Sequence, residues 1–230
     1  SPGDRVICLN AGKFGERWVK LAKAYGLDPF EVRAPTGEAL GKQDLETARA
    51  QIVGPIAGVL FQANETSTGV ALPTQEITQW CQENQCLSVC DAITACGVIP
   101  LPMDAWGIDA LITGSQKALM IPPGLAFIAL SEKAWARQSQ SRLPKFYFDL
   151  ARERKLQAKN QTAWTPAISL ICGLHASFLE IEKTGWPVLF RRFDVLARAT
   201  RAGVLAMGLE LLSPNAPSTS VTAVQLPMPP

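Results

Sequence analysis

An aspartate and a lysine that follow predicted strands could together support amine chemistry. Asp91 ends the apolar run 87–91, and Lys117 follows the run 109–113 after Gly-Ser-Gln. An aspartate in this place is often only a helix cap, and most lysines are simply solvated. The apolar residues after Lys117 nevertheless predict partial burial, which would lower its pKa and make its amine a usable nucleophile.

Two further segments could bind a ligand beside these residues. Residues 10–17 read as a glycine-rich loop with an aromatic, and residues 64–69 as a hydroxyl-rich turn. Both follow predicted strands, and ligands in α/β sheets gather at the carboxyl ends of strands. We therefore expect the loop, the turn, Asp91 and Lys117 to lie together at one edge of a sheet.

This combination of side chains matches the requirements of pyridoxal phosphate (PLP). The ring of this cofactor withdraws electrons only while its nitrogen is protonated, and a nearby carboxylate keeps it protonated. A lysine holds the aldehyde as an imine, an aromatic face stacks on the ring, and hydroxyl and amide donors bind the oxygens. The residues thus predict PLP as the cofactor.

The elements that must position these residues follow an alternating pattern up to about residue 135. Short apolar runs predict strands at residues 5–9, 31–33, 58–62, 87–91, 109–113 and 126–130. Amphipathic stretches between them predict helices that include residues 17–25, 44–51 and 74–83. The pattern favours an α/β fold, a mostly parallel sheet with helices on both faces.

The character of the chain changes after residue 166. Two long helices are predicted at residues 166–183 and 187–207, then a loop at 213–218 and one strand at 220–226. A lone strand cannot close a domain. We expect residues 1–212 to form a large domain, and residues 213–230 a linker and the first strand of a small domain that is cut off.

Composition narrows the class of protein. Of the 230 residues, 47% are apolar and 18% charged, and the net charge of +2 argues against nucleic acid as a partner. No apolar run is long enough to span a membrane, and the start has neither a signal peptide nor an initiating Met. We expect a cytoplasmic protein whose sequence begins within a domain.

Six cysteines raise the alternative of an electron-transfer protein, which would contain iron. They lie at positions 8, 81, 86, 90, 96 and 172, with a single histidine at 175. Their spacing matches neither zinc templates nor common iron–sulfur patterns, and strand alternation puts Cys90 on the face opposite Asp91. No metal site is predicted.

Several motifs together resemble one family. They are GKFGER at residues 12–17, ETSTG at 65–69, CDAI at 90–93, GID at 107–109, and GSQKAL at 114–119 before PPG at 122–124. On these motifs the chain resembles, from Pro2 to its end, class V aminotransferases of the alanine:glyoxylate and serine:pyruvate type, within the fold type I PLP enzymes. The resemblance implies transfer of an amino group between alanine or serine and glyoxylate or pyruvate.

The resemblance also implies a role for individual residues. Lys117 is the Schiff-base lysine and moves the proton, and Asp91 pairs with the ring nitrogen. Phe14 stacks on one ring face, Ile93 packs under the other, and Thr66 bonds the phenolic oxygen.

The phosphate contacts implied by the resemblance involve two subunits. Gln116 helps to hold the phosphate, and a hydroxyl from the partner subunit, Thr162 or Thr165, completes the contact. The resemblance thus implies a homodimer with shared active sites.

The chain also departs from the family pattern. Relatives begin with a phosphate-cradling loop and end with a small domain that holds a substrate-binding arginine, and we expect both to be missing, so no arginine is assigned. Alternatives are a non-catalytic dimerising subunit or a PLP lyase or desulfurase of the same fold, although Phe14 argues against a desulfurase. Some relatives are labelled soluble hydrogenase small subunit, but the sequence holds no ligand set for activating hydrogen.

Overall fold

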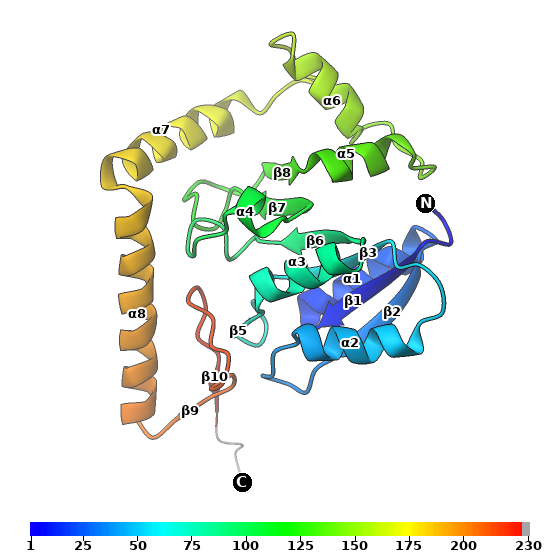
Figure 1. The fold of residues 1–230 in the computed structure, drawn as a ribbon. Helices are drawn as coiled ribbons and strands as arrows, with labels where there is room; N and C mark the ends of the chain where they lie inside the picture. Colours follow the sequence, from blue (N-terminus) through cyan, green and yellow to red (C-terminus); the bar gives the residue numbers. More distant parts are fainter. Residues whose placement is uncertain (227–230) are drawn as a thin grey trace.

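A six-stranded sheet forms the centre of the structure, a computed structural model that describes residues 1–226 (Figure 1). Five strands are parallel and β8 is antiparallel to its neighbour β7. The strand order is β2 (Asp28–Arg33), β1 (Arg5–Asn10), β3 (Gly58–Gln62), β6 (Leu87–Asp91), β7 (Ala110–Gly114) and β8 (Ala126–Leu130). The predicted α/β fold with a mostly parallel sheet is confirmed.

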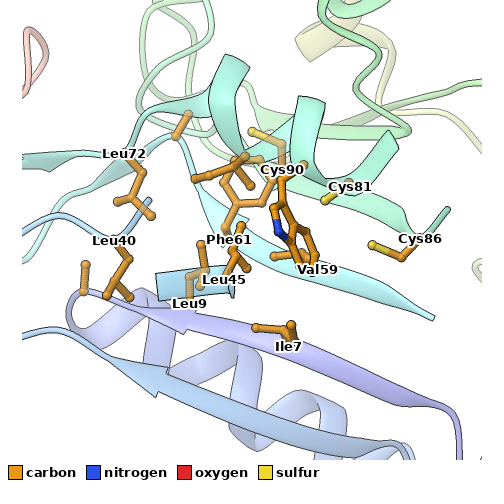
Figure 2. Close-up of a cluster of buried hydrophobic side chains, with 14 of the residues drawn as sticks. Ile7, Leu9, Leu40, Leu45, Val59, Phe61, Leu72, Cys81, Cys86 and Cys90 are labelled. Atoms are coloured by element: carbon orange, nitrogen blue, oxygen red, sulfur yellow. The ribbon is translucent and has the colours of Figure 1, made fainter. Parts of the chain in front are cut away.

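Helices cover both faces of the sheet. Because alternate side chains of a strand point to opposite faces, β1 contributes to two separate cores. Val6 and Cys8 pack with α1 (Lys13–Ala24), whereas Ile7 and Leu9 belong to a larger cluster with α2 (Lys42–Gln51) and α3 (Thr74–Glu83). Figure 2 shows Ile7 and Leu9 directed from β1 toward the rest of this cluster.

Two cysteines meet where α3 ends. Gln85 has a positive φ of 56°, and the N–H of Cys86 bonds to the carbonyl of Cys81 at 3.0 Å. This Schellman turn joins the end of α3 to the next residues, and Figure 2 shows the buried side chains of Cys81 and Cys86 beside the core cluster. Among residues 1–226, no group of three or more histidine, cysteine or acidic side chains could hold a metal ion.

Two predicted boundaries were wrong near the site, and one predicted turn contains a hairpin. Helix α1 begins at Lys13 instead of residue 17, so residues 10–17 do not form a loop. Strand β2 begins at Asp28 and includes Pro29, which is tolerated because β2 is an edge strand. The hydroxyl-rich turn contains a small hairpin of β4 (Asn64–Glu65) and β5 (Val70–Ala71), too short for a periodicity signal.

The later part of the chain is helical. After α4 (Met103–Trp106), α5 (Glu132–Ser139) and α6 (Leu150–Gln157) come two long helices, α7 (Ile168–Thr184) and α8 (Trp186–Ala206). The two long helices were predicted, with small shifts in their bounds. They extend along the outside of the sheet domain in Figure 1 and bury few side chains. Within residues 1–226, no helix has the length and apolar character needed to cross a membrane.

The segment after α8 folds back onto the sheet domain. The predicted strand at 220–226 shrinks to β10 (Val224–Gln225), and it pairs with β9 (Glu210–Leu211). Backbone hydrogen bonds also join Ala216 and Ser218 to the β5 hairpin. A domain boundary at residue 212 stays a prediction, and residues 227–230 lie outside the described part.

Candidate active site

The predicted ring partner and the predicted lysine lie on neighbouring strands. Asp91 is the last residue of β6 and pairs in register with Ile112 of β7. Lys117 follows β7 by three residues, and Phe14 and Thr66 follow β1 and β3 at the same edge. Parallel strands end at a common edge, so the fold gathers these four residues on one side of the sheet.

The loop that carries Lys117 is held at several points. The Ser115 hydroxyl donates to the carbonyl of Pro122 at 2.8 Å and accepts from the N–H of Leu125 at 3.2 Å. The Ser177 hydroxyl of α7 donates to the carbonyl of Leu119 at 2.6 Å. Lys117 therefore sits on a fixed backbone, and the residue is exposed.

Lys117 and Thr66 line one cavity of about 620 Å³. Thr94 joins them, with its hydroxyl oxygen 3.2 Å from that of Thr66. The remaining lining comes mostly from α8 and residues 219–222. The volume is in the range of cofactor sites. The prediction that Lys117 is partly buried was wrong for this single chain, because the cavity is open and the lysine is exposed.

Asp91 and Ile93 lie outside that lining, at the end of β6. Asp91 is half-buried, and its Oδ1 accepts from the backbone N–H of Ile93 at 2.9 Å. Burial raises the pKa of the Asp91 carboxyl. The Ile93 N–H and the charge of Arg17 lower this pKa, whereas the charge of Glu65 raises it. A bound cation beside Asp91 would offset the cost of burial.

Phe14 lies on the first turn of α1 and is half-buried. The guanidinium carbon of Arg17 lies 4.9 Å from the centre of its ring, a cation–π contact. One face of Phe14 is thus covered by Arg17, and a stacked ligand would use the other.

Glu65 holds Phe14 in this place, a role that the sequence did not reveal. One carboxylate oxygen accepts from the N–H of Phe14 at 3.0 Å and of Gly15 at 2.9 Å. The other accepts from the N–H and the hydroxyl of Ser67 at 3.0 and 2.6 Å. Glu65 is fully buried, and it satisfies two free N–H groups of the α1 start as a cap supplied from another strand.

Gly12 makes this contact possible. A Cβ at position 12 would lie 2.4 Å from the Ser67 hydroxyl oxygen and 2.7 Å from the Glu65 carboxyl carbon. Only glycine fits between the start of α1 and the turn. Glu65 and Gly12 were both part of the quoted motifs, but no spacing rule links residues so far apart in the chain.

Of the predicted phosphate contacts, only Gln116 lies at this edge within the single chain, in the loop that carries Lys117. Gln116 is exposed and folds back against Gly114. Thr162 and Thr165 are exposed beside an aromatic cluster, and the Thr162 hydroxyl donates to the carbonyl of Trp164. Among the hydrogen bonds of residues 1–226, none joins these threonines to the other predicted site residues. Their role, as residues of a partner subunit, stays a prediction.

Comparison with known proteins identifies the family of the chain. The profile of the family "Aminotransferase class-V" matches residues 1–226. A relative from Anabaena cylindrica, "Soluble hydrogenase 42 kDa subunit", is 39% identical over 99% of this chain and 60% of its own length. The L-aspartate–glyoxylate aminotransferase of Paracoccus denitrificans is 35% identical over 99% of this chain and 59% of its own length.

A solved structure agrees with these relatives. The alanine–glyoxylate aminotransferase of Nostoc sp. superposes with a TM-score of 0.93 at 28% identity, over 99% of this chain and 61% of that chain. The chain thus spans about 60% of the length of the relatives it matches.

The chain belongs to the class V aminotransferase family. The predicted family and fold type are confirmed, and membership confirms PLP as the cofactor of this class.

Proposed function

We propose that the chain holds PLP between Asp91 and Lys117 as part of an aminotransferase. The observation that carries the proposal is the placement of a half-buried carboxylate at the end of β6, beside the strand whose following loop carries an exposed lysine. When bound, the cofactor would supply a ring that withdraws electrons from the amino acid.

Two residues of the chain would have separate roles at that ring. Asp91 would hold a proton on the ring nitrogen, and a protonated ring beside it would offset the burial that raises the pKa of its carboxyl. Lys117 would hold the cofactor through its side-chain amine, and the same amine, when free, would be placed to take a proton from the substrate's Cα.

The contacts to the faces and edge of the ring are assigned in the same way. Phe14 and Ile93 would cover the two faces, and Thr66 would donate to the phenolic oxygen. Thr66 is suited to this role because its hydroxyl already lines the cavity that contains Lys117. Gln116 would bind the phosphate together with Thr162 or Thr165 of a partner subunit.

The proposed substrates are a small amino acid, alanine or serine, and a 2-oxo acid, glyoxylate or pyruvate. Relatives named for aspartate, serine and alanine all share glyoxylate in their names. These names support a small acceptor more strongly than any one amino donor. No substrate-binding arginine is assigned among the described residues.

A homodimer is the proposed assembly. Helices α7 and α8 carry apolar side chains that are half-exposed or more in the single chain, including Ile168, Leu179, Val188 and Leu205. A second copy over this surface would bury apolar area and supply the partner threonines. The proposed location is the cytoplasm, where unpaired cysteines such as those among the described residues are usual.

Borohydride trapping tests the proposal. The purified chain mixed with PLP should absorb in the near-visible, and reduction should fix the label on Lys117, located by peptide mass spectrometry. Lys117→Ala should lose the label completely, while Lys155→Ala, at an exposed lysine of α6, should keep it. A label spread over several lysines would contradict the assigned role. A colourless, stable dimer would favour a non-catalytic subunit.

A further inference from the structure

Gln62, the last residue of β3, is a buried amide without partners. Its side chain is 0% exposed, and neither Nε2 nor Oε1 has a hydrogen-bond partner among the described residues. Buried amides are normally satisfied, and an unpaired one costs free energy. The residue therefore calls for an explanation from its surroundings.

A neighbouring buried amide shows what is usual in this part of the fold. Asn10 ends β1 as Gln62 ends β3. Its Nδ2 donates to Glu31 at 2.6 Å, and its Oδ1 accepts from the N–H of Gly12 at 3.1 Å. Both of its amide atoms are used, in contrast to those of Gln62.

The group beside Gln62 is Asp91. The two residues are paired in register across β3 and β6. Leu60 and Val89, two positions earlier on each strand, both pack in the smaller core under α1. By strand alternation Gln62 and Asp91 point to that same face, so their side chains are neighbours.

One carboxylate oxygen of Asp91 is an acceptor without a hydrogen bond among the described residues. Its Oδ1 accepts from the N–H of Ile93, and its Oδ2 has no hydrogen bond among residues 1–226. An unpaired amide donor and an unpaired carboxylate acceptor thus lie side by side. The structure shows no hydrogen bond between them, so the contact requires a change in the side-chain torsion angles of Gln62.

We propose that Gln62 is a positioning residue for Asp91, whose ionised carboxylate it binds through the amide N–H and turns toward the ring nitrogen of the cofactor. The assignment of the ring nitrogen rests on the function proposed above. The physical benefit is that a hydrogen bond to the charged form opposes the effect of burial on the carboxyl. The buried amide of Gln62 then serves the active site and does not contribute to the stability of the fold.

Gln62→Met separates this role from a structural one. Methionine has a similar shape and no polar atoms, so at a pH low enough to protonate Asp91 the variant should leave the unfolding midpoint of the cofactor-free chain unchanged or higher. If Gln62 acts on Asp91, the ionisation constant of Asp91 should fall about tenfold, the effect of one hydrogen bond to a charged group. Carboxyl carbon NMR over a pH series measures this shift, with Asp91→Asn to assign the signal.

The same variant should also bind PLP about tenfold more weakly in a fluorescence titration. Leu60→Met is the matched control, because it changes the same strand and face without touching a polar group. It should leave both the Asp91 titration and PLP binding unchanged. Charges near Asp91, those of Glu65 and Arg17, are the same in both variants.

The two proposals fail in different ways. An Asp91 titration in Gln62→Met equal to that of the unchanged chain would overturn the role of Gln62, whatever the result for PLP. A shifted titration in a chain that binds no PLP would instead sustain the contact with Asp91 and overturn the proposed function.

Discussion

The sheet half of the molecule, residues 5–130, and its helical arm, α7 with α8, differ in how they are stabilised. Both cores of buried side chains are built from the sheet half. In the helical arm, only Ser177, Ile181, Ala197 and Val204 are buried. The residues proposed to hold the ring come from the sheet half, which has its own buried cores. The helical arm buries few side chains, so its stability depends on contacts beyond those within the single chain.

Replacing a tryptophan in each half should give the largest difference. Trp80 is fully buried, and its ring N–H donates to Glu46 at 2.8 Å. Trp80→Ala should lower the free energy of unfolding by about 3–5 kcal/mol. Trp186 in the helical arm is 37% exposed, and Trp186→Ala should cost less than half as much. Denaturant unfolding measures both, and equal costs would refute the contrast between the halves.

Glu65→Gln should have the next largest effect. All four contacts of the carboxylate come from donors, and the amide of glutamine would turn a donor toward two of them. We expect a loss of about 1–3 kcal/mol in unfolding free energy and weaker PLP binding, because Phe14 is released.

Glu38→Gln serves as the control for Glu65, since Glu38 is exposed. Glu38→Gln should change neither the free energy of unfolding nor the affinity for PLP. Normal PLP binding in a destabilised Glu65→Gln chain would show that the cap stabilises α1 without positioning Phe14.

Asp91→Asn should separate stability from function inside the sheet half. Burial raises the pKa of Asp91 in the folded chain above its value in the unfolded chain, so folding favours the protonated carboxyl. Its contribution to stability is present at low pH and is lost as the pH rises through the raised pKa.

The cofactor-free Asn variant should therefore be more stable near neutral pH, within about 1 kcal/mol. The difference should vanish below about pH 3, where the carboxyl is protonated in the unfolded chain as well. Thermal unfolding across this pH range is the measurement, and transamination by the variant should fall by orders of magnitude. A variant less stable at neutral pH would mean that the charged carboxylate is well satisfied in the cofactor-free chain.

The smallest effect is expected on the outer face of the helical arm. Leu205→Gln, at a side chain that is 56% exposed, should change unfolding of the single chain by no more than about 0.5 kcal/mol. Val204→Gln, one residue away and buried, should cost clearly more. Sedimentation would show whether Leu205→Gln weakens a dimer. Unchanged assembly would remove this position from the proposed interface.

The sequence predicted the strands better than their surroundings. The bounds 58–62, 87–91 and 126–130 were correct, because each is an apolar run closed by a polar or turn-forming residue. The start of α1 was missed because Gly12 precedes it and the capping group is Glu65, about fifty positions further along the chain. Local patterns cannot reveal a cap supplied by another strand.

The same limit applies to the site. Asp91 and Lys117 could be placed at the sheet edge because a strand end is visible in the sequence. The exposure of Lys117 could not, because it depends on which elements close the cavity and not on its apolar neighbours. Gln62 was read as the end of an apolar run, and only the pairing of β3 with β6 shows that it faces the Asp91 side.

The Glu65 cap also decides where an anion can bind. The start of a helix carries a partial positive charge and free N–H groups, and is a common seat for phosphate. In α1 the N–H groups of Phe14 and Gly15 are already turned onto an internal carboxylate. The Glu65 carboxylate would repel a negative charge at the start of α1. The phosphate of a bound cofactor would therefore be bound by positive or N–H groups of other elements.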